Sequence, residues 1–182
     1  MTKRLFVAIE LPPDIKKELS IICDFFTQRE LFVGRCTCPE NLHLTLKFIG
    51  LVYKDVVPAI NEKLKNIYCN ACTGTLAPLG VLPTRRISRI LYAGLDCFCL
   101  PILAKQIQES LKDYTRPKDH EFKNHITLAR MKQIPNKEDF LYALDNFGMP
   151  ELSFDIKEFV LKESELTREG PIYTTIARYT LY

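Results

Sequence analysis

The spacing of apolar and polar positions predicts strands and helices in turn along the chain. Alternation at period two predicts strands, and apolar residues every three or four positions predict amphipathic helices. Expected strands cover residues 4–10, 31–37, 42–50, 75–82, 88–95, 122–131, 152–162 and 172–182. One helix is expected to begin at Pro12-Pro13-Asp14, and others to cover about 55–68, 98–114 and 136–147, the last capped by Asn136. The apolar parity slips between Ile156 and Phe159, which indicates a bulge.

The order of these elements repeats. Strand, helix, strand, helix, strand occupies residues 4–82, and the same order runs from residue 88 to the end. The closing strands, joined at Gly170-Pro171, favour an antiparallel sheet, and no linker separates the halves. We therefore predict an α+β fold in a single bilobal domain, residues 1–182, with pseudo-two-fold-related lobes at about 4–82 and 88–182. Helices would cover the outside of the antiparallel sheet, and a central cleft would lie between the lobes.

Two of the expected strands carry the same polar motif. It is His43-Leu44-Thr45-Leu46 in the first half and His125-Ile126-Thr127-Leu128 in the second. Because buried polar groups need hydrogen-bonding partners, a histidine and a threonine on an apolar strand indicate either a hydrogen-bonded structural role or a functional site. Two such strands facing one cleft would place two imidazoles and two hydroxyls around one small anion. Alternation puts the polar residues on one face and the apolar ones on the other: His43, Thr45 and Lys47 against Leu42, Leu44, Leu46 and Phe48.

Two facing histidines suit a reaction that needs a proton donor and a proton acceptor near neutral pH. A threonine two residues along can donate its hydroxyl to a phosphate oxygen. The sequence has no carboxylate-rich magnesium motif and no phosphate-binding glycine loop, so we predict metal-free phosphodiester hydrolysis without a cofactor. The alternative is that each histidine is structural. Two copies at matching positions, in a chain with three histidines, favour catalysis, whereas His120 is expected on the surface.

Composition narrows the class of protein. The chain has 182 residues, 47% hydrophobic and 26% charged, as is ordinary for a soluble globular domain. Its net charge of +3 is compatible with a polyanionic partner without requiring one. No apolar run approaches the roughly 20 residues of a membrane span. Residues 1–4 lead into an expected strand rather than a signal peptide, so we expect a cytoplasmic protein.

The seven cysteines fit a reducing compartment, and we expect reduced thiols. Neither Cys36/Cys38 nor Cys97/Cys99 has the separation of an ordinary disulfide. Zinc is the alternative, because the Cys69/Cys72 pair has ligand-like spacing and the Cys36/Cys38 pair would complete a four-sulfur site. It is the weaker hypothesis, since free cysteine is often simply a small buried apolar residue.

The sequence around both motifs resembles a known family. Residues 39–50, with the second motif extended by Ala129-Arg130, resemble the bacterial and archaeal RNA 2′,3′-cyclic phosphodiesterases. That family, also known as the 2′-5′ RNA ligases, belongs to the two-histidine phosphoesterase superfamily. Residues 4–12, 89–95, 163–166 and 170–173 resemble its opening strand, middle strand and closing hairpin, so the likeness spans nearly the whole chain. Cys36-Thr37-Cys38 departs from it, where the family often has an aromatic residue and a proline.

The resemblance implies a substrate and a role for each site residue. The substrate would be an RNA or oligonucleotide 3′ end with a 2′,3′-cyclic phosphate, or a small cyclic-phosphate nucleotide, and the product a 2′-phosphomonoester. His43 would be the proton donor and His125 the proton acceptor, although the motifs by themselves do not orient this assignment. Thr45 and Thr127 would hold the non-bridging oxygens. Arg130 would neutralise phosphate charge.

Three further expectations concern residues outside the motifs. Strand parity puts Arg130 on the face opposite His125, so its role requires a twist or bulge; the alternative is a surface arginine. Phe48 would stack on the terminal base, or else belong to the core. Arg85 and Arg86 would meet backbone phosphates, or form an ordinary solvated turn.

Other functions are compatible with the same residues. The site would also suit 2′-5′ RNA ligation or non-catalytic binding of RNA ends, and the cysteines would suit a zinc-stabilised structural module. Hydrolysis is favoured over ligation because no nucleotide-activation motif is present. It is favoured over binding alone because all four motif residues are retained. We expect a monomer.

Overall fold

A computed structural model describes residues 1–83, 89–115, 122–168 and 170–182. In this part of the chain there are four α-helices: α1 (Pro13–Gln28), α2 (Val57–Lys65), α3 (Cys99–Ser110) and α4 (Lys137–Asn146). The strands are β1 (Thr2–Glu10), β2 (Val33–Cys36), β3 (His43–Tyr53), β4 (Cys72–Pro83), β5 (Arg89–Asp96), β6 (His125–Gln133), β7 (Ser153–Ile156), β8 (Glu158–Leu166) and β9 (Pro171–Thr180).

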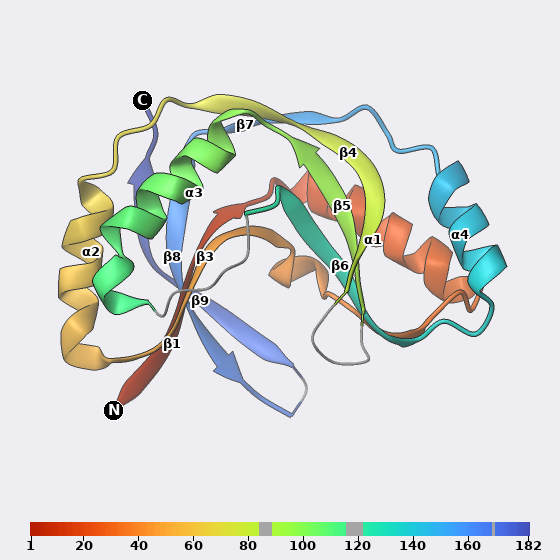
Figure 1. Cartoon of the computed structure of the whole chain (residues 1–182), viewed down its shortest axis with the longest axis horizontal. Helices are drawn as coiled ribbons and strands as arrows, with labels where there is room; N and C mark the ends of the chain where they lie inside the picture. Colours follow the sequence, from red (N-terminus) through yellow and green to blue (C-terminus); the bar gives the residue numbers. More distant parts are fainter. Residues whose placement is uncertain (84–88, 116–121, 169) are drawn as a thin grey trace.

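The described strands form one antiparallel sheet, which confirms the predicted α+β class. Its order is β7-β4-β5-β6-β3-β1-β8-β9, and β2 pairs with residues 129–133 of β6 along the edge that also meets β3 (Figure 1). The sheet has two halves that meet where β3 and β6 are paired by Leu44 and Ile126. Since these are the central residues of the two motifs, the junction of the halves is also the place where the motifs meet.

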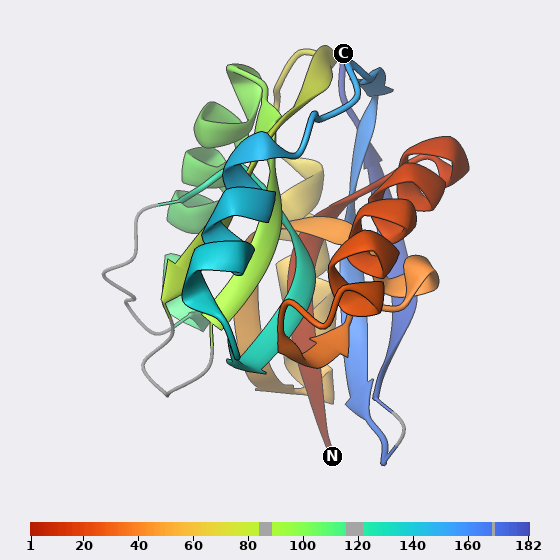
Figure 2. The same ribbon diagram turned by 90° about the vertical axis from the view of Figure 1, so that its right-hand side faces the viewer.

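The helices cover the outside of this curled sheet, as predicted. Helices α1 and α4 pack against β6 and β4 at one end, and α3 and α2 pack against β3 and β9 at the other (Figures 1 and 2). The predicted cap is confirmed, because the Asn136 Oδ1 accepts hydrogen bonds from the N–H groups of Glu138 and Asp139. The buried face of α1 has the predicted helical spacing, with Ile15, Leu19, Ile22, Cys23 and Phe26.

The two halves of the sheet do not follow the expected lobes, and that expectation is wrong. Strand β4 pairs with β5 and β7, whereas β8 and β9 extend the half that contains β1. Residues 4–82 and 88–182 therefore exchange strands. The parity slip between Ile156 and Phe159 is the crossing point rather than a bulge: β7 ends at Ile156, and β8 begins at Glu158 in the other half.

The cysteines also depart from expectation. Disulfides join Cys23 to Cys36 and Cys72 to Cys99, so the expectation of reduced thiols is wrong for these four residues. The proposed zinc set of Cys69/Cys72 with Cys36/Cys38 is not assembled, because Cys36 and Cys72 are each bonded to a different partner. Within the described residues, no helix is both long and apolar enough to cross a membrane.

Packing around α4 generates a first prediction. Phe140 is 1% exposed and its ring packs near that of Phe26, whereas Tyr142 on the same helix is 71% exposed. We expect Phe140→Ala to lower the free energy of unfolding by about 3–5 kcal/mol, because it removes a buried aromatic ring and leaves a cavity. Tyr142→Ala is the matched control, with an expected change within about 0.5 kcal/mol. Equal losses in urea denaturation of the two variants would contradict the packing described.

Candidate active site

One cavity of about 640 Å³ lies between the halves of the sheet and collects all six predicted site residues. His43, Thr45 and Phe48 reach it from β3, and His125, Thr127 and Arg130 from β6. Arg85, Arg86 and His120 lie outside the described residues. The cavity is also lined by Arg4, Leu5, Phe6, Arg35, Cys36, Thr37, Cys38, Asn41, Gly50, Ser164, Leu166, Thr167, Gly170, Pro171, Ile172 and Tyr173.

The pairing of β3 with β6 explains why the motifs share a cavity. Leu44 and Ile126 are fully buried and face each other across the strands. Because side chains alternate along a strand, the flanking histidines and threonines point to the opposite face. In the antiparallel register set by this pair, His43 is the counterpart of Thr127, and Thr45 that of His125. The cavity-facing residues of the two motifs therefore lie opposite each other across this strand pair.

A bulge brings Arg130 to the same face as His125. Along β5 and β6, Leu91 pairs with Ala129 and Tyr92 with Thr127, so Leu128 is the extra residue. The extra residue reverses the alternation beyond it, and Ala129 is buried while Arg130 is exposed at the cavity. The carbonyl of Leu128 accepts a hydrogen bond from the N–H of Thr37 at 2.7 Å. This confirms the bulge that the role of Arg130 requires.

The first motif has a bulge at the equivalent position. Along β1 and β3, Val7 pairs with Lys47 and Ala8 with Thr45, so Leu46 is the extra residue. Phe48 consequently lines the cavity and is 56% exposed, whereas Lys47 is not among the lining residues. The expectation that Phe48 shares the apolar face with Leu44 is therefore wrong, because strict alternation does not continue through the bulge.

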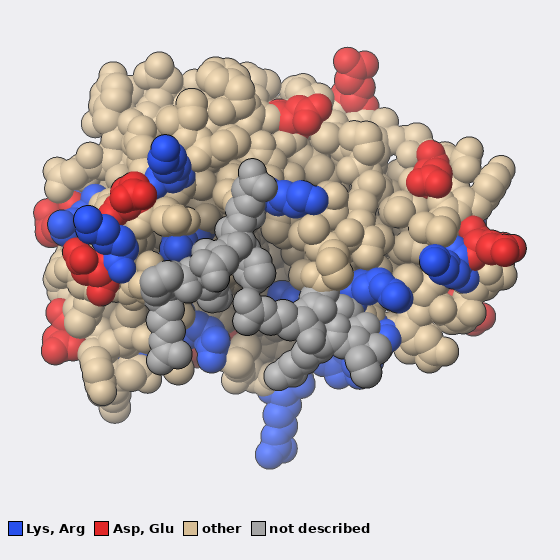
Figure 3. Space-filling view, viewed as in Figure 1, with Lys and Arg blue, Asp and Glu red and all other residues tan. Residues whose placement is uncertain are grey.

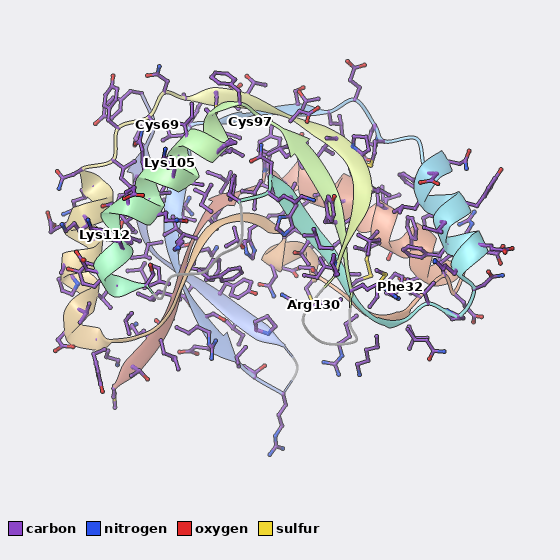
Figure 4. The ribbon with its side chains drawn as sticks, in the orientation of Figure 1. Phe32, Cys69, Cys97, Lys105, Lys112 and Arg130 are labelled. Atoms are coloured by element: carbon purple, nitrogen blue, oxygen red, sulfur yellow. A yellow bond between two sulfur atoms is a disulfide. The ribbon has the colours of Figure 1, made fainter. Side chains whose placement is uncertain are left out.

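Phe48 and Arg130 occupy equivalent places in the two motifs. Each lies five residues after its motif histidine and beyond the matching bulge. One half of the cavity therefore presents an aromatic ring where the other presents a guanidinium. Figure 4 labels Arg130, below the centre of the molecule in the view of Figure 1.

Both histidines are oriented by backbone carbonyls. The Nδ1 of His43 donates to the carbonyl of Asn41 at 2.6 Å, and the Nδ1 of His125 donates to that of Lys123 at 2.9 Å. Since a carbonyl only accepts, the proton of each neutral ring resides on Nδ1 and leaves Nε2 as the acceptor. The Nε2 of His43 lies 3.0 Å from the Thr45 hydroxyl, which donates to it in the neutral state.

The two histidines differ in their surroundings. The ring of His43 lies beside Phe6 and Tyr173, with centroids 5.0 and 5.3 Å away. Burial lowers the pKa of His43 to about 4, and the positive charges of Lys162 and Lys16 act in the same direction. The hydrogen bond to Asn41 and the charge of Glu10 oppose this only partly. His43 is therefore neutral at neutral pH in the free protein.

The cavity is built for a negatively charged ligand. Its described lining contains three arginines (Arg4, Arg35 and Arg130) and no carboxylate. Arg35 on β2 pairs directly with Arg130 on β6. Burial raises the pKa of Tyr173, and the charge of Arg130 acts in the opposite direction. Figure 3 shows Lys and Arg side chains across the middle and lower part of one face, with most acidic ones at its margins.

Sequence reasoning did not assign a role to several of these residues. Arg4, Arg35 and Tyr173 come from β1, β2 and β9 and line the same cavity. The Asn41 side chain donates to the carbonyl of Pro171 at 2.9 Å, which holds the β8–β9 hairpin against the first motif. Tyr173 had a signal in the hairpin that resembles the family. Arg35 had none, because its pairing with Arg130 is not encoded in local spacing.

The comparisons with known proteins agree with this geometry. A family model described as "LigT like Phosphoesterase" matches residues 9–92 and 102–173. The chain is 30% identical to the RNA 2′,3′-cyclic phosphodiesterase of Methanocaldococcus jannaschii, over 97% of this chain and 99% of that protein. It is also 30% identical to the protein of the same name from Archaeoglobus fulgidus, over 93% and 96% of the two chains.

Solved structures show the same arrangement. Escherichia coli LigT in its apo form superposes with a TM-score of 0.78 at 26% identity, covering 99% of this chain and 98% of that one. The same protein complexed with 3′-AMP superposes with a TM-score of 0.77 at 25% identity, covering 100% and 99%. The family model covers most of the chain and includes both histidine motifs. This chain belongs to the LigT-like phosphoesterase family.

Proposed function

We propose that the chain hydrolyses 2′,3′-cyclic phosphates at RNA or oligonucleotide 3′ ends to 2′-phosphomonoesters, and acts on small cyclic-phosphate nucleotides. The observation that carries this is the Leu44–Ile126 pairing. It makes the imidazoles and threonine hydroxyls of both motifs point into one cavity that is also lined by arginines. The names of the relatives and the 3′-AMP complex of the E. coli protein support the substrate class.

The roles follow from the positions of the acceptor nitrogens. His125 takes a proton from water through Nε2 as the water oxygen attacks phosphorus. The bond from phosphorus to the 3′ oxygen breaks, and His43 gives that oxygen a proton. The hydroxyls of Thr45 and Thr127 donate to the non-bridging oxygens, on which negative charge develops. Arg130 neutralises this charge with two parallel N–H donors.

His43 must gain a proton before it can give one. It is neutral in the free protein, because its pKa lies near 4. A phosphate anion beside the ring favours the charged imidazolium, and so raises the pKa of His43. The Thr45 hydroxyl, which donates to Nε2 in the free protein, then turns to the phosphate. Substrate binding and proton uptake are thus coupled at His43.

The remaining parts of the cavity position the nucleotide. Its volume of about 640 Å³ is within the usual range for a small-molecule site. The exposed ring of Phe48 offers a stacking surface for the terminal base. The described lining lacks the carboxylates that magnesium prefers, which supports metal-free chemistry. One chain supplies both motifs, which supports a monomer, and the proposed RNA substrate suits the expected cytoplasmic location.

Turnover of a defined oligonucleotide ending in a 2′,3′-cyclic phosphate tests the function. In the presence of a chelator we expect conversion to the 2′-phosphate, with kcat lowered about 10²- to 10⁴-fold in His43→Ala and in His125→Ala, because each removes a proton-transfer group. Tyr142→Ala, on α4, should retain the wild-type rate. Unchanged turnover in both histidine variants would refute the mechanism. Activity lost in chelator and restored by magnesium or manganese, but not by zinc, would refute its metal-free form.

The role of His43 is tested by NMR titration of the two imidazoles. In the free protein we expect His43 to titrate near pH 4, and its pKa to rise when a 2′-phosphomonoester product is bound. The sign follows from charge: burial disfavours the imidazolium, and a bound anion favours it. A His43 pKa that stays low in the complex would exchange the two roles and make His43 the proton acceptor.

The phosphate contact is tested at Arg130. We expect Arg130→Ala to lower kcat/KM about 10- to 100-fold, the worth of about 1.5–3 kcal/mol for hydrogen bonds to a charged group. Arg130→Lys should recover only part of this, since lysine keeps the charge but loses the paired donors. Arg29→Ala is the control, because Arg29 packs over Phe25 on α1 and is not a lining residue. An equal loss in the Arg29 variant would indicate a general effect of positive charge.

A further inference from the structure

Three of the seven cysteines, Cys72, Cys97 and Cys99, lie together where β4 begins and β5 leads into α3, and Cys69 lies three residues before Cys72. Cys72 is the first residue of β4. Cys97 directly follows β5, and Cys99 is the first residue of α3. Figure 4 labels Cys69 and Cys97 in the upper part of the view, beside the upper end of α3, and Arg130 below them. None of the four is among the residues that line the active-site cavity.

The strand register brings these segments together. Thr75 of β4 pairs with Asp96 of β5. Beyond this pair, the Cys72–Cys99 disulfide joins the first residue of β4 to the first residue of α3. The segment that contains Cys69 is held in place by the C-terminus, because the Ala71 N–H donates to the carbonyl of Tyr182 and the Tyr182 N–H donates to that of Cys69.

The sulfur of Cys97 lies beside the Cys72–Cys99 disulfide. The Sγ of Cys97 lies 3.5 Å from that of Cys72 and 3.3 Å from that of Cys99. All three Sγ atoms lie within 4.8 Å of one another. In a tetrahedral zinc site with Zn–S distances of about 2.3 Å, neighbouring sulfurs are about 3.8 Å apart. The two contacts of Cys97 are already near this spacing, and reduction of the Cys72–Cys99 disulfide would let the other two sulfurs separate to it.

We propose that the reduced form of this cluster binds one zinc ion through Cys69, Cys72, Cys97 and Cys99. The Cys-x-x-Cys and Cys-x-Cys spacings supply two pairs of ligands from two adjacent segments. A small cellular thiol reduces the Cys72–Cys99 disulfide to two thiols and is itself oxidised to a disulfide. Zinc then replaces the four thiol protons, which pass to solvent.

Cys69 supplies the fourth ligand. It is 8% exposed, and its spacing from Cys72 is that of a ligand pair. The Cys72–Cys99 disulfide leaves Cys69 and Cys97 as buried thiols without a bond, whereas zinc uses all four sulfurs.

Metal binding would fasten three parts of the fold to one another. These are the first residue of β4, the first turn of α3 and the C-terminal segment at Tyr182. The carbonyl of Cys97 also accepts a hydrogen bond from the Asn124 side chain at 2.9 Å. Since Asn124 directly precedes His125, the cluster supports the backbone that carries the second motif.

Metal analysis of the full chain tests this proposal. The protein is expressed with a histidine-free tag, purified in a thiol reductant without chelator, and analysed by plasma mass spectrometry. We expect about one zinc per chain. Replacement of zinc by cobalt should give the charge-transfer and visible bands of a tetrahedral thiolate site. Both measurements use the wild-type chain, so they do not depend on whether a variant folds.

Single substitutions identify the ligands. Cys69→Ser, Cys72→Ser, Cys97→Ser and Cys99→Ser should each lose the zinc, whereas Cys38→Ser, which changes a free exposed cysteine outside the cluster, should retain it. A zinc-free wild-type chain, or a Cys72–Cys99 disulfide in protein purified with reductant, would overturn the proposal. Zinc retained in any of the four cluster variants, or lost in Cys38→Ser, would overturn the proposed ligand set.

Discussion

The pairing of Leu44 with Ile126 is the constraint on which the rest of the site depends. It joins the two halves of the sheet at the centres of both motifs. Because these two residues are buried, the polar residues beside them are turned into the space between the halves. The apolar core thus does the positioning. Helices on the outer faces of the sheet keep this pair buried while the opposite face remains open to a ligand.

Matching bulges give the two motifs the same geometry and allow different chemistry. In each strand the extra residue is the leucine that ends the motif, Leu46 or Leu128, so the next cavity-facing side chain lies five residues after the histidine. That place holds Phe48 in one half and Arg130 in the other. The histidines diverge in a similar way, because His43 is enclosed by aromatic rings and keeps a low pKa. The two motifs therefore share one backbone geometry, while their side chains provide different chemical groups to the cavity.

Much of the site was predictable because its signals are local. The motif residues, the capped helix at Asn136 and the antiparallel class follow from spacing and residue type. The need for a bulge before Arg130 was also evident, since its parity conflicts with that of His125. The bulge at Leu46 was missed because no residue of the first motif had an expected role that conflicted with alternation. Phe48 was therefore assigned to the wrong face of its strand. Arg4, Arg35 and Tyr173 reach the cavity from three other strands, and for Arg35 neither a motif nor a parity conflict indicated this position.

The sequence by itself determined where strands and helices form and which polar residues interrupt them, because backbone preference and alternation act over a few neighbours. Only the tertiary structure decided which strands pair. It placed β4 and β8 in the opposite halves from those expected, and it grouped Cys72 with Cys97 and Cys99 rather than with Cys36 and Cys38. It also gave two equivalent histidines different environments. Pairing, burial and charge depend on residues far apart in the chain, and local spacing carries no record of them.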